Sequence, residues 1–247
     1  MKNAPTCSLA RWAASTALRA CFVEKQPPSQ AAERFGYSAG TLRVMCCKFR
    51  RHPSLDDVPG VTTTRDGHPG DPLNVALIGT ETEVKALLLA AQWHPADPLG
   101  LRSDLEIAAA TVLRRSYDDA PVSNLYLWGR KEDLAFEQPV GNDPRKRNHV
   151  RFWRSEKIDP DGRPVWVGSA TYDERVGLSH TTGQITHHIA PDVDAERDHL
   201  FRCLEQTGDL SEVYAVDDFH KICEGRNGGG DPWVTDGRLL VGVIAAE

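Results

Sequence analysis

The sequence predicts an α+β protein, with a mixed, largely antiparallel sheet and about three helices, preceded by a small three-helix unit of the helix-turn-helix kind. From Leu73 onward, seven or eight strand patterns do not alternate regularly with helices, which favours helices covering an antiparallel sheet. Residues 1–54 carry nine Lys or Arg and two Asp or Glu, whereas the remainder carries 20 and 33. Such a charge split is typical of two units with different partners.

The first unit, residues 1–52, is expected to contain three helices. Apolar residues between Leu9 and Ala20 have helical spacing, and Pro27-Pro28 should end that segment. Ser29 is expected to cap a short helix, Gln30–Phe35. After a Gly36-Tyr37 turn, Ser38 is expected to cap a third helix that runs from Ala39 to about Arg51.

The third helix is expected to have an apolar face and a basic face. A short helix, a turn with glycine and a basic second helix predict binding to duplex DNA, since phosphate neutralisation dominates that affinity. The candidate DNA contacts are Arg43, Lys48, Arg50 and Arg51. The stretch SQAAERFGYSAGTLRVMCCKFRR resembles the N-terminal helix-turn-helix of transposases and related homeodomain-like proteins. The alternative is a small helical bundle with a solvated basic face.

Residues 53–72 are rich in Pro and Gly and are expected to be a linker to the second unit, residues 73–247. The elements expected before residue 140 are a strand Leu73–Gly79, a helix Glu81–Trp93 capped by Thr80, a helix from Ser103 to about Arg115, and strands or a hairpin at Asn124–Trp128 and Leu134–Phe136.

The stretch RNHVRFW, residues 147–153, overlaps the expected strand Asn148–Arg154 and organises the second unit. Because side chains alternate along a strand, Val150 and Phe152 should face the core. The turn signal at 159–162 predicts an antiparallel hairpin with Pro164–Tyr172. The elements expected after it are a strand Gln184–Ala190, a helix Ala195–Gln206 capped by Asp194 and ended at Gly208, strands Ser211–Ala215 and Leu239–Ile244, and a flexible loop at 227–232.

The opposite face of RNHVRFW lines up two guanidiniums, an imidazole and the indole of Trp153. Such a face suits an anion such as phosphate. The candidate anion-binding residues are Arg147, His149, Arg151 and, from the first turn of the following helix, Arg197. The alternative is an ion-pair network with Asp192, Asp194 and Glu196. A catalytic version would use a histidine as general acid or base for phosphoester hydrolysis, although no nucleophile motif accompanies it.

A metal site is a further expectation from the same segments. Its candidate ligands are His149, His187, His188, Asp192 and Asp194. His187 and His188 are adjacent on a strand and face opposite ways, so they cannot both bind one ion there, and one of them is expected in the core. The alternative role of Asp194 is to cap the following helix. The alternative role of Asp198 is to form an ion pair with Arg202 on the helix surface.

Several stretches recur together in one known family. They are NVALIGT at 74–80, AAQW at 90–93, PVSNLYLWGRKEDLAFEQPVG at 121–141, RNHVRFWR at 147–154, VWVGSATYD at 165–173 and THHIAPDVDAERDHL at 186–200. Residues 73–205 thereby resemble the LssY C-terminal domain of bacteria. The resemblance implies little chemistry, because the family's biochemical role is undefined. Its members are often joined to membrane-embedded segments, which implies a membrane-associated partner protein.

The chain itself carries no apolar run near the ~20 residues of a membrane-spanning helix and no signal-peptide pattern. Its six cysteines include no C-x-x-C pair. The sequence thus predicts a soluble, cytoplasmic protein: a ligand-binding, anion-binding or interaction module coupled to a DNA-binding helix-turn-helix. The alternative is a phosphoester hydrolase with a His/Arg site, with or without a metal. The sequence identifies no cofactor or substrate.

Overall fold

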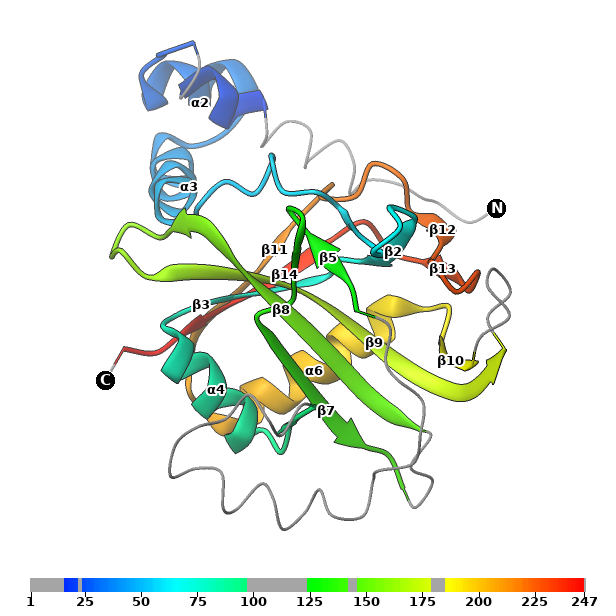
Figure 1. Cartoon of the computed structure of the whole chain (residues 1–247). Coiled ribbons are helices and arrows are strands. Elements are labelled where there is room, and N and C mark those ends of the chain that lie inside the picture. Colours follow the sequence, from blue (N-terminus) through cyan, green and yellow to red (C-terminus); the bar gives the residue numbers. More distant parts are fainter. Residues whose placement is uncertain (1–15, 22–23, 97–123, 142–145, 179–184, 247) are drawn as a thin grey trace, which may run out of the picture. The chain divides into compact units, whose positions relative to one another are not determined.

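The structure is a computed structural model that describes residues 16–21, 24–96, 124–141, 146–178 and 185–246. The chain divides into two compact units, Met1–Ser54 with Asp159–Gly162, and Leu55–Ile158 with Arg163–Glu247. The predicted α+β class with largely antiparallel sheets is confirmed (Figure 1). The helix predicted at 103–115 lies outside the described residues.

In its described residues the first unit has three short helices: residues 16–21, α2 Pro28–Phe35 and α3 Ala39–Arg51. Gly36 ends α2 in the left-handed region (φ 74°), and Ser38 Oγ accepts a hydrogen bond from Thr41 N at 3.0 Å, as expected for the cap of α3. The prediction that Ser29 caps α2 was wrong, because Pro27 precedes a helix that begins at Pro28. A proline at the first helical position has no N–H to leave unpaired. The core of this unit consists of Ala17, Ala20, Ala31, Ala32, Leu42 and Cys46.

An eight-stranded sheet forms the centre of the second unit (Figure 1). In order across the sheet, its strands are β11 Leu210–Val216, β14 Leu239–Ile244, β3 Val75–Ile78, β9 Pro164–Leu178, β8 Arg147–Ile158, β7 Leu134–Pro139 and β4 His94–Pro95, and β10 Ile185–Ile189 pairs with β9. Only the β14–β3 pair is parallel among the described strands.

Within the described residues, two smaller sheets and two helices complete this unit. The smaller sheets contain β1 Val61–Thr63, β2 Pro69–Pro72, β5 Tyr126–Leu127 and β6 Arg130–Lys131, and separately β12 Glu224–Arg226 and β13 Pro232–Val234. The helices are α4 Glu81–Ala90 and α6 Val193–Thr207, which pack against each other. Thr80 caps α4 as predicted, in a reciprocal capping box with Glu83.

The segment 53–72, expected to be a linker, contributes β1 and β2 to the second unit. Leu55 and Val58 are buried in one of its hydrophobic cores. One glycine of this segment, Gly70, is required by close packing, because a Cβ there would lie 2.4 Å from Thr62 Oγ1. The segment whose composition predicted a linker therefore contains two short strands of the second unit.

The β8–β9 hairpin forms as predicted, around a turn in which Gly162 N donates to Asp159 O at 3.0 Å. Its side chains alternate between two hydrophobic cores. Val150, Phe152 and Trp166 pack in the core that contains α4 and α6, whereas Trp153 and Val167 pack in the core on the other face. Because both faces are covered, the polar residues His149 and Arg151 on the Trp153 face of β8 are buried as well, and Arg147 is half-buried. Their burial makes their hydrogen bonds and ion pairs the main features of the site described next.

Candidate functional site

The register of the β8–β9 hairpin brings polar side chains together on one sheet face. Arg147 pairs with Asp173, His149 with Thr171, and Arg151 with Ser169. Paired residues in an antiparallel ladder point to the same face. We call this group and its nearest polar neighbours the polar layer: Asp71, Glu132, Glu137, Arg147, His149, Arg151, Ser169, Thr171, Asp173, His188 and Asp231.

Arg147 is held by two carboxylates at hydrogen-bond distance. Its Nε donates to Asp173 Oδ2 at 3.1 Å and its Nη1 to Glu137 Oε2 at 3.0 Å. Burial raises the pKa of Glu137 and of Asp173, and the Arg147 guanidinium opposes that rise. This end of the polar layer matches the ion-pair alternative, although with partners that the sequence did not suggest.

Arg151 is more deeply buried than Arg147, but its contacts with Asp71 and Glu132 are longer. Nη1 lies 3.5 Å from Asp71 Oδ2, and Nε lies 3.9 Å from Glu132 Oε1. Both distances are longer than the roughly 2.7–3.2 Å that is typical of an N–H···O hydrogen bond. Burial raises the pKa of Asp71, against the effect of Arg151 and of a hydrogen bond from Asn227 Nδ2. The contacts of Arg151 with Asp71 and Glu132 are therefore longer than those of Arg147 with Asp173 and Glu137.

Two polar atoms near Arg151 lack a hydrogen-bond partner within the described part of the chain. They are Ser169 Oγ, on a residue only 2% exposed, and Glu132 Oε2. Leaving a buried polar atom unpaired costs about 1–3 kcal/mol, so native proteins rarely keep one without a reason. The surroundings of Arg151 are thus the part of the polar layer whose hydrogen bonding is incomplete.

His188 and Asp231 form a buried pair at the β10 side of the polar layer. The distance from Nδ1 to Asp231 Oδ1 is 2.6 Å, and Asp231 Oδ2 accepts from Ile189 N at 3.4 Å. The carboxylate fixes the orientation of the imidazole, as in histidines that act as general bases. His149, the other candidate histidine of the layer, is 3% exposed.

The predicted metal ligands divide among different surroundings. Asp192 and Asp194 lie at the start of α6, and the side chain of His187 lies outside the described residues. Among the residues that the structure does describe, no three His, Cys, Asp or Glu side chains are grouped so as to hold a metal ion.

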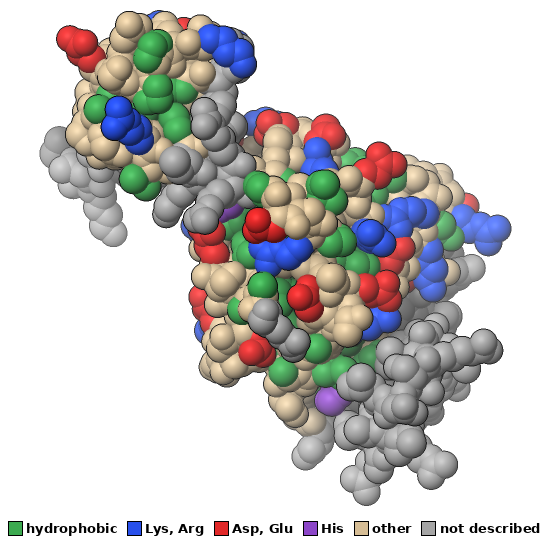
Figure 2. Space-filling model, turned by 90° about the vertical axis from the view of Figure 1, so that its left-hand side faces the viewer, with side chains coloured by type: hydrophobic (Ala, Val, Ile, Leu, Met, Phe, Trp, Pro, Cys, Tyr) green, Lys and Arg blue, Asp and Glu red, His purple; other side chains and the backbone are tan. Residues whose placement is uncertain are grey.

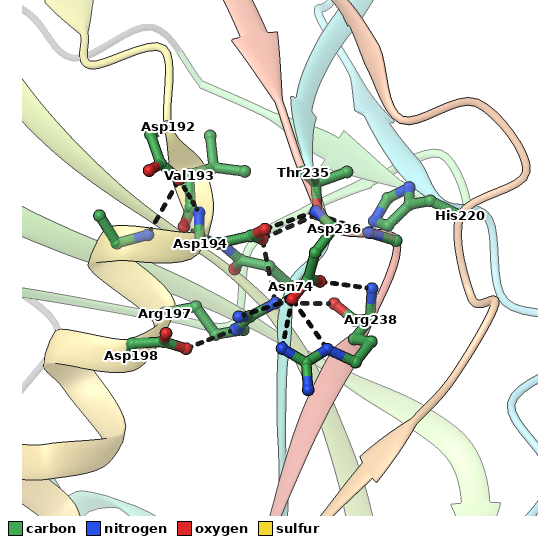
Figure 3. A network of polar contacts seen from close by, with 12 residues as sticks. Asn74, Asp192, Val193, Asp194, Arg197, Asp198, His220, Thr235, Asp236 and Arg238 are labelled. Atoms are coloured by element: carbon green, nitrogen blue, oxygen red, sulfur yellow. Dashed lines mark hydrogen bonds and ion pairs between the residues drawn. The ribbon is translucent and has the colours of Figure 1, made fainter. Parts of the chain in front are cut away.

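Arg197 bonds to a different set of carboxylates from the two strand arginines (Figure 3). Its Nη1 donates to Asp194 Oδ1 at 3.0 Å and to Asp236 Oδ1 at 2.8 Å, while Nε donates to Asp198 Oδ1 at 2.8 Å. Burial alone would raise the pKa of Asp236, but hydrogen bonds from Arg197 and Arg238 hold it below its ordinary value. This network ties α6 to the segment before β14.

The start of α6 differs from the prediction. Asp192, not Asp194, is the cap, since its Oδ1 accepts from Asp194 N at 3.1 Å and from Ala195 N at 3.2 Å. The carboxylate of Asp194 is instead engaged by Arg197 and by Thr235 Oγ1, at 2.8 Å from the latter. Gly208 ends the helix in the left-handed region as predicted (φ 81°).

Of the three acids expected to pair with the arginines, Asp194 does so. Asp198, expected to pair with Arg202, contacts Arg197 instead. Glu196 is buried, and its Oε1 has no hydrogen-bond partner among the described residues. Burial and the nearby Asp173 raise the pKa of Glu196 to about 9.

The sequence interpretation missed Asp71, Glu132, Glu137, Ser169, Thr171, Asp173 and Asp231. One signal was available for part of this set: Ser169, Thr171 and Asp173 alternate along GSATYD, which predicts a polar face on the second hairpin strand. Asp71 and Asp231 lie in Gly- and Pro-containing segments far from β8 in the sequence. Only the fold brings them to the polar layer.

The candidate DNA contacts lie on α3. Arg43 is exposed, whereas the side chains of Lys48, Arg50 and Arg51 lie outside the described residues. On the face drawn in Figure 2, basic and acidic side chains are interspersed over the second unit. Among the described helices, none combines the length and apolar character that crossing a bilayer requires.

The comparisons with known proteins add one match. A family model described as LssY C-terminus matches residues 55–239, and so covers most of the second unit and the whole polar layer. No curated protein and no solved structure matches the chain.

Proposed function

Because the chain belongs to the LssY C-terminus family, we propose that its second unit is a ligand-binding module whose site is the polar layer around Arg151. The family match gives no reaction, so the proposal depends on the chemistry of this site. The observation that carries it is the unpaired hydroxyl of Ser169, buried directly opposite Arg151 in the β8–β9 ladder.

The hydrogen bonding around Arg151 supports a bound molecule. Ser169 Oγ and Glu132 Oε2 each retain an unused capacity to bond, and the contacts of Arg151 to Asp71 and Glu132 are long. A polar ligand between these groups would complete their hydrogen bonds. The cost of leaving them unpaired in the empty protein would then be recovered on binding.

The balance of charge indicates the kind of ligand. Each of the two strand arginines meets two carboxylates, so acidic groups outnumber guanidiniums in the polar layer. A simple anion would have to compete with Asp71 and Glu132 for Arg151. A small zwitterion instead offers its anionic group to Arg151 and Ser169 and its cationic group to the carboxylates. Of the four residues that were expected to bind an anion, the proposal therefore retains Arg151.

Thermal unfolding of the full chain with three probes tests this proposal. Inorganic phosphate supplies the anion alone, ethanolamine the cation alone, and phosphoethanolamine both. We expect phosphoethanolamine to raise Tm most, since only binding to the folded state stabilises it. The shift should fall in Ser169→Ala and persist in the control Ser211→Ala, which removes a hydroxyl on β11 that donates to Val243 O at 3.1 Å and lies outside the polar layer. Equal shifts with all three probes, or none, would indicate that the polar layer is a structural ion-pair network.

A second candidate function, binding to duplex DNA, concerns the first unit alone. Its support is the turn at 36–38, which has Gly36 in the left-handed region and Ser38 as the cap of α3, together with the exposed Arg43 on that helix. This geometry and the basic composition of residues 1–54 suit a helix that lies along a groove. Phosphoester hydrolysis remains a prediction, for which the oriented His188–Asp231 pair is the available base.

A further inference from the structure

A second group of polar side chains lies on the α6 side of the large sheet, opposite to the polar layer. Gln138 of β7 and Asn148 of β8 are directly paired in the antiparallel ladder, so their side chains share the face on which Phe152 packs. His199 and Cys203 are four residues apart on α6 and therefore lie on one face of that helix. We call these four polar side chains, Gln138, Asn148, His199 and Cys203, the α6 cluster.

Three polar atoms of the α6 cluster form a closed triangle. His199 Nε2 lies 2.8 Å from both Gln138 Oε1 and Asn148 Nδ2. Asn148 Nδ2 in turn lies 3.1 Å from Gln138 Oε1 and donates to it. The amide of Gln138 is oriented by its other end, where Nε2 donates to Ala91 O at 3.4 Å and to Gln92 O at 3.5 Å. Gln138 Oε1 therefore faces the other two atoms as an acceptor.

Hydrogen bonds alone do not satisfy this triangle. An amide oxygen only accepts, an amide nitrogen only donates, and an imidazole nitrogen does one or the other. Three such atoms in mutual contact always include two donors or two acceptors, because a triangle has an odd number of sides. With a proton, His199 Nε2 faces the donor Asn148 Nδ2; without one, it faces the acceptor Gln138 Oε1. Turning the Asn148 amide moves the conflict to its contact with Gln138.

A bound cation satisfies the whole α6 cluster. With the Asn148 amide turned, two amide oxygens and the unprotonated His199 Nε2 present lone pairs to one point, and Cys203 Sγ lies 3.7 Å from the same nitrogen. Ligands of a tetrahedral Zn²⁺ ion, at about 2.0–2.1 Å for N or O and about 2.3 Å for S, lie about 3.3–3.6 Å from one another. The distances of 2.8, 3.1 and 3.7 Å within the cluster are close to these values.

We propose that the four side chains of the α6 cluster bind one Zn²⁺ ion, through two amide oxygens, one imidazole nitrogen and one thiolate. Imidazole and thiolate suit zinc, whereas Mg²⁺ and Ca²⁺ prefer oxygen ligands alone. The Cys203 thiol releases its proton to solvent on binding. Burial lowers the pKa of His199, which favours the neutral form that a metal requires. The fully buried Trp93 packs beside His199, with 6.2 Å between the ring centroids. None of the four ligands is among those that the sequence predicted for a metal.

Absorption spectroscopy of the full chain with Co²⁺, a coloured substitute for Zn²⁺, tests the site under reducing conditions. We expect a thiolate-to-cobalt charge-transfer band that saturates at one ion per chain and disappears when Zn²⁺ is added. The band should be lost in Cys203→Ser and persist in the matched control Cys223→Ser, which removes an exposed cysteine. A wild type without this band, or an unchanged band in Cys203→Ser, overturns the proposal.

Two further variants test the other ligands without depending on the cysteine. A carboxylate is a common zinc ligand, so Asn148→Asp should bind Zn²⁺ about tenfold more tightly than the wild type, measured by competition with a chelating dye. His199→Gln should bind at least about tenfold more weakly, since even the outer partners of metal ligands typically contribute that much. Circular dichroism checks that both variants are folded. Equal Zn²⁺ affinity in the wild type and both variants would show that the α6 cluster is a hydrogen-bonded part of the core, and would overturn the proposal.

Discussion

Ser169 lies opposite Arg151 in the β8–β9 ladder, and its buried hydroxyl has no hydrogen-bond partner among the described residues. Four residues further along each strand, Arg147 and Asp173 form a hydrogen-bonded ion pair at 3.1 Å. One sheet face thus combines a tightly bonded end with an end whose bonding is incomplete. The first contributes to the structure of the domain, and the second is the place where a ligand would gain most.

Removing the unpaired hydroxyl should not weaken the protein without ligand. We expect Ser169→Ala to leave the free energy of unfolding unchanged or to raise it, because no hydrogen bond is lost. The matched control is Ser155→Ala, whose buried hydroxyl donates to Val165 O at 2.8 Å and whose loss should cost about 1 kcal/mol. Urea unfolding of both variants measures the difference. A loss in Ser169→Ala as large as in Ser155→Ala would show that Ser169 is already bonded.

The two strand arginines should differ in their effect on stability. Arg147→Ala leaves Glu137 and Asp173 buried without their cation, a change that typically costs about 3–5 kcal/mol. Arg151→Ala should cost less, because its contacts to Asp71 and Glu132 are longer. Phe152→Ala, which empties a buried aromatic position on the opposite face, provides a reference of about 3–5 kcal/mol. If Arg151→Ala destabilises as much as Arg147→Ala in denaturant titrations, Arg151 is a structural residue.

The raised pKa of Glu196 predicts a dependence of stability on pH. Folding shifts this pKa upward, from 4.5 to about 9, so the folded state holds the proton more tightly than the unfolded state. The contribution is therefore fully present below the unfolded pKa of 4.5 and is lost as the pH rises towards 9. Glu196→Gln is neutral at every pH. We expect its stability relative to wild type to increase between about pH 5 and about pH 8.

Denaturant titrations of wild type and Glu196→Gln across that range measure this difference. Glu205→Gln, an exposed acid on the same helix, is the control and should show little change. A constant difference between wild type and Glu196→Gln would mean that Glu196 titrates normally and is not held neutral by its surroundings.

Binding of the chain to duplex DNA should weaken as salt increases. Each phosphate contact contributes a slope of about −0.9 to log affinity against log salt. Arg43→Ala should therefore reduce the magnitude of the slope by about that amount, measured by fluorescence anisotropy between about 50 and about 200 mM salt. The control is Arg34→Ala, which alters a basic residue of α2 that pairs with Glu24. Affinity that does not change with salt would contradict a DNA-binding role.

Local sequence patterns predicted much of the central hairpin. Alternation placed Val150 and Phe152 in one core and Trp153 on the other face, and the 159–162 turn signal located the reversal. The cap Thr80 followed from its position before an apolar stripe. Each of these features depends on interactions between residues that are near in sequence.

The parts that were missed depend on distant contacts. Asp71 reaches Arg151 through β2, and Asp231 reaches His188 through the β12–β13 loop, and neither partner has a local signal. At the start of α6, two aspartates were equally suitable caps by sequence. Arg197 and Thr235 occupy the carboxylate of Asp194, and Asp192 is left to cap the helix. The covered second face of β8 likewise followed from the arrangement of the strands.

The central claim is that Arg151 lies at a ligand site, and calorimetric titration of the full chain with phosphoethanolamine tests it most directly. We expect saturable binding at one site per chain in the wild type and in Arg154→Lys, a control for the same substitution at an exposed position of β8. Arg151→Lys should bind about tenfold more weakly, a loss of about 1.4 kcal/mol, because lysine cannot reproduce the planar fork of donors. Undiminished binding in Arg151→Lys, or no binding to the wild type, would contradict the claim.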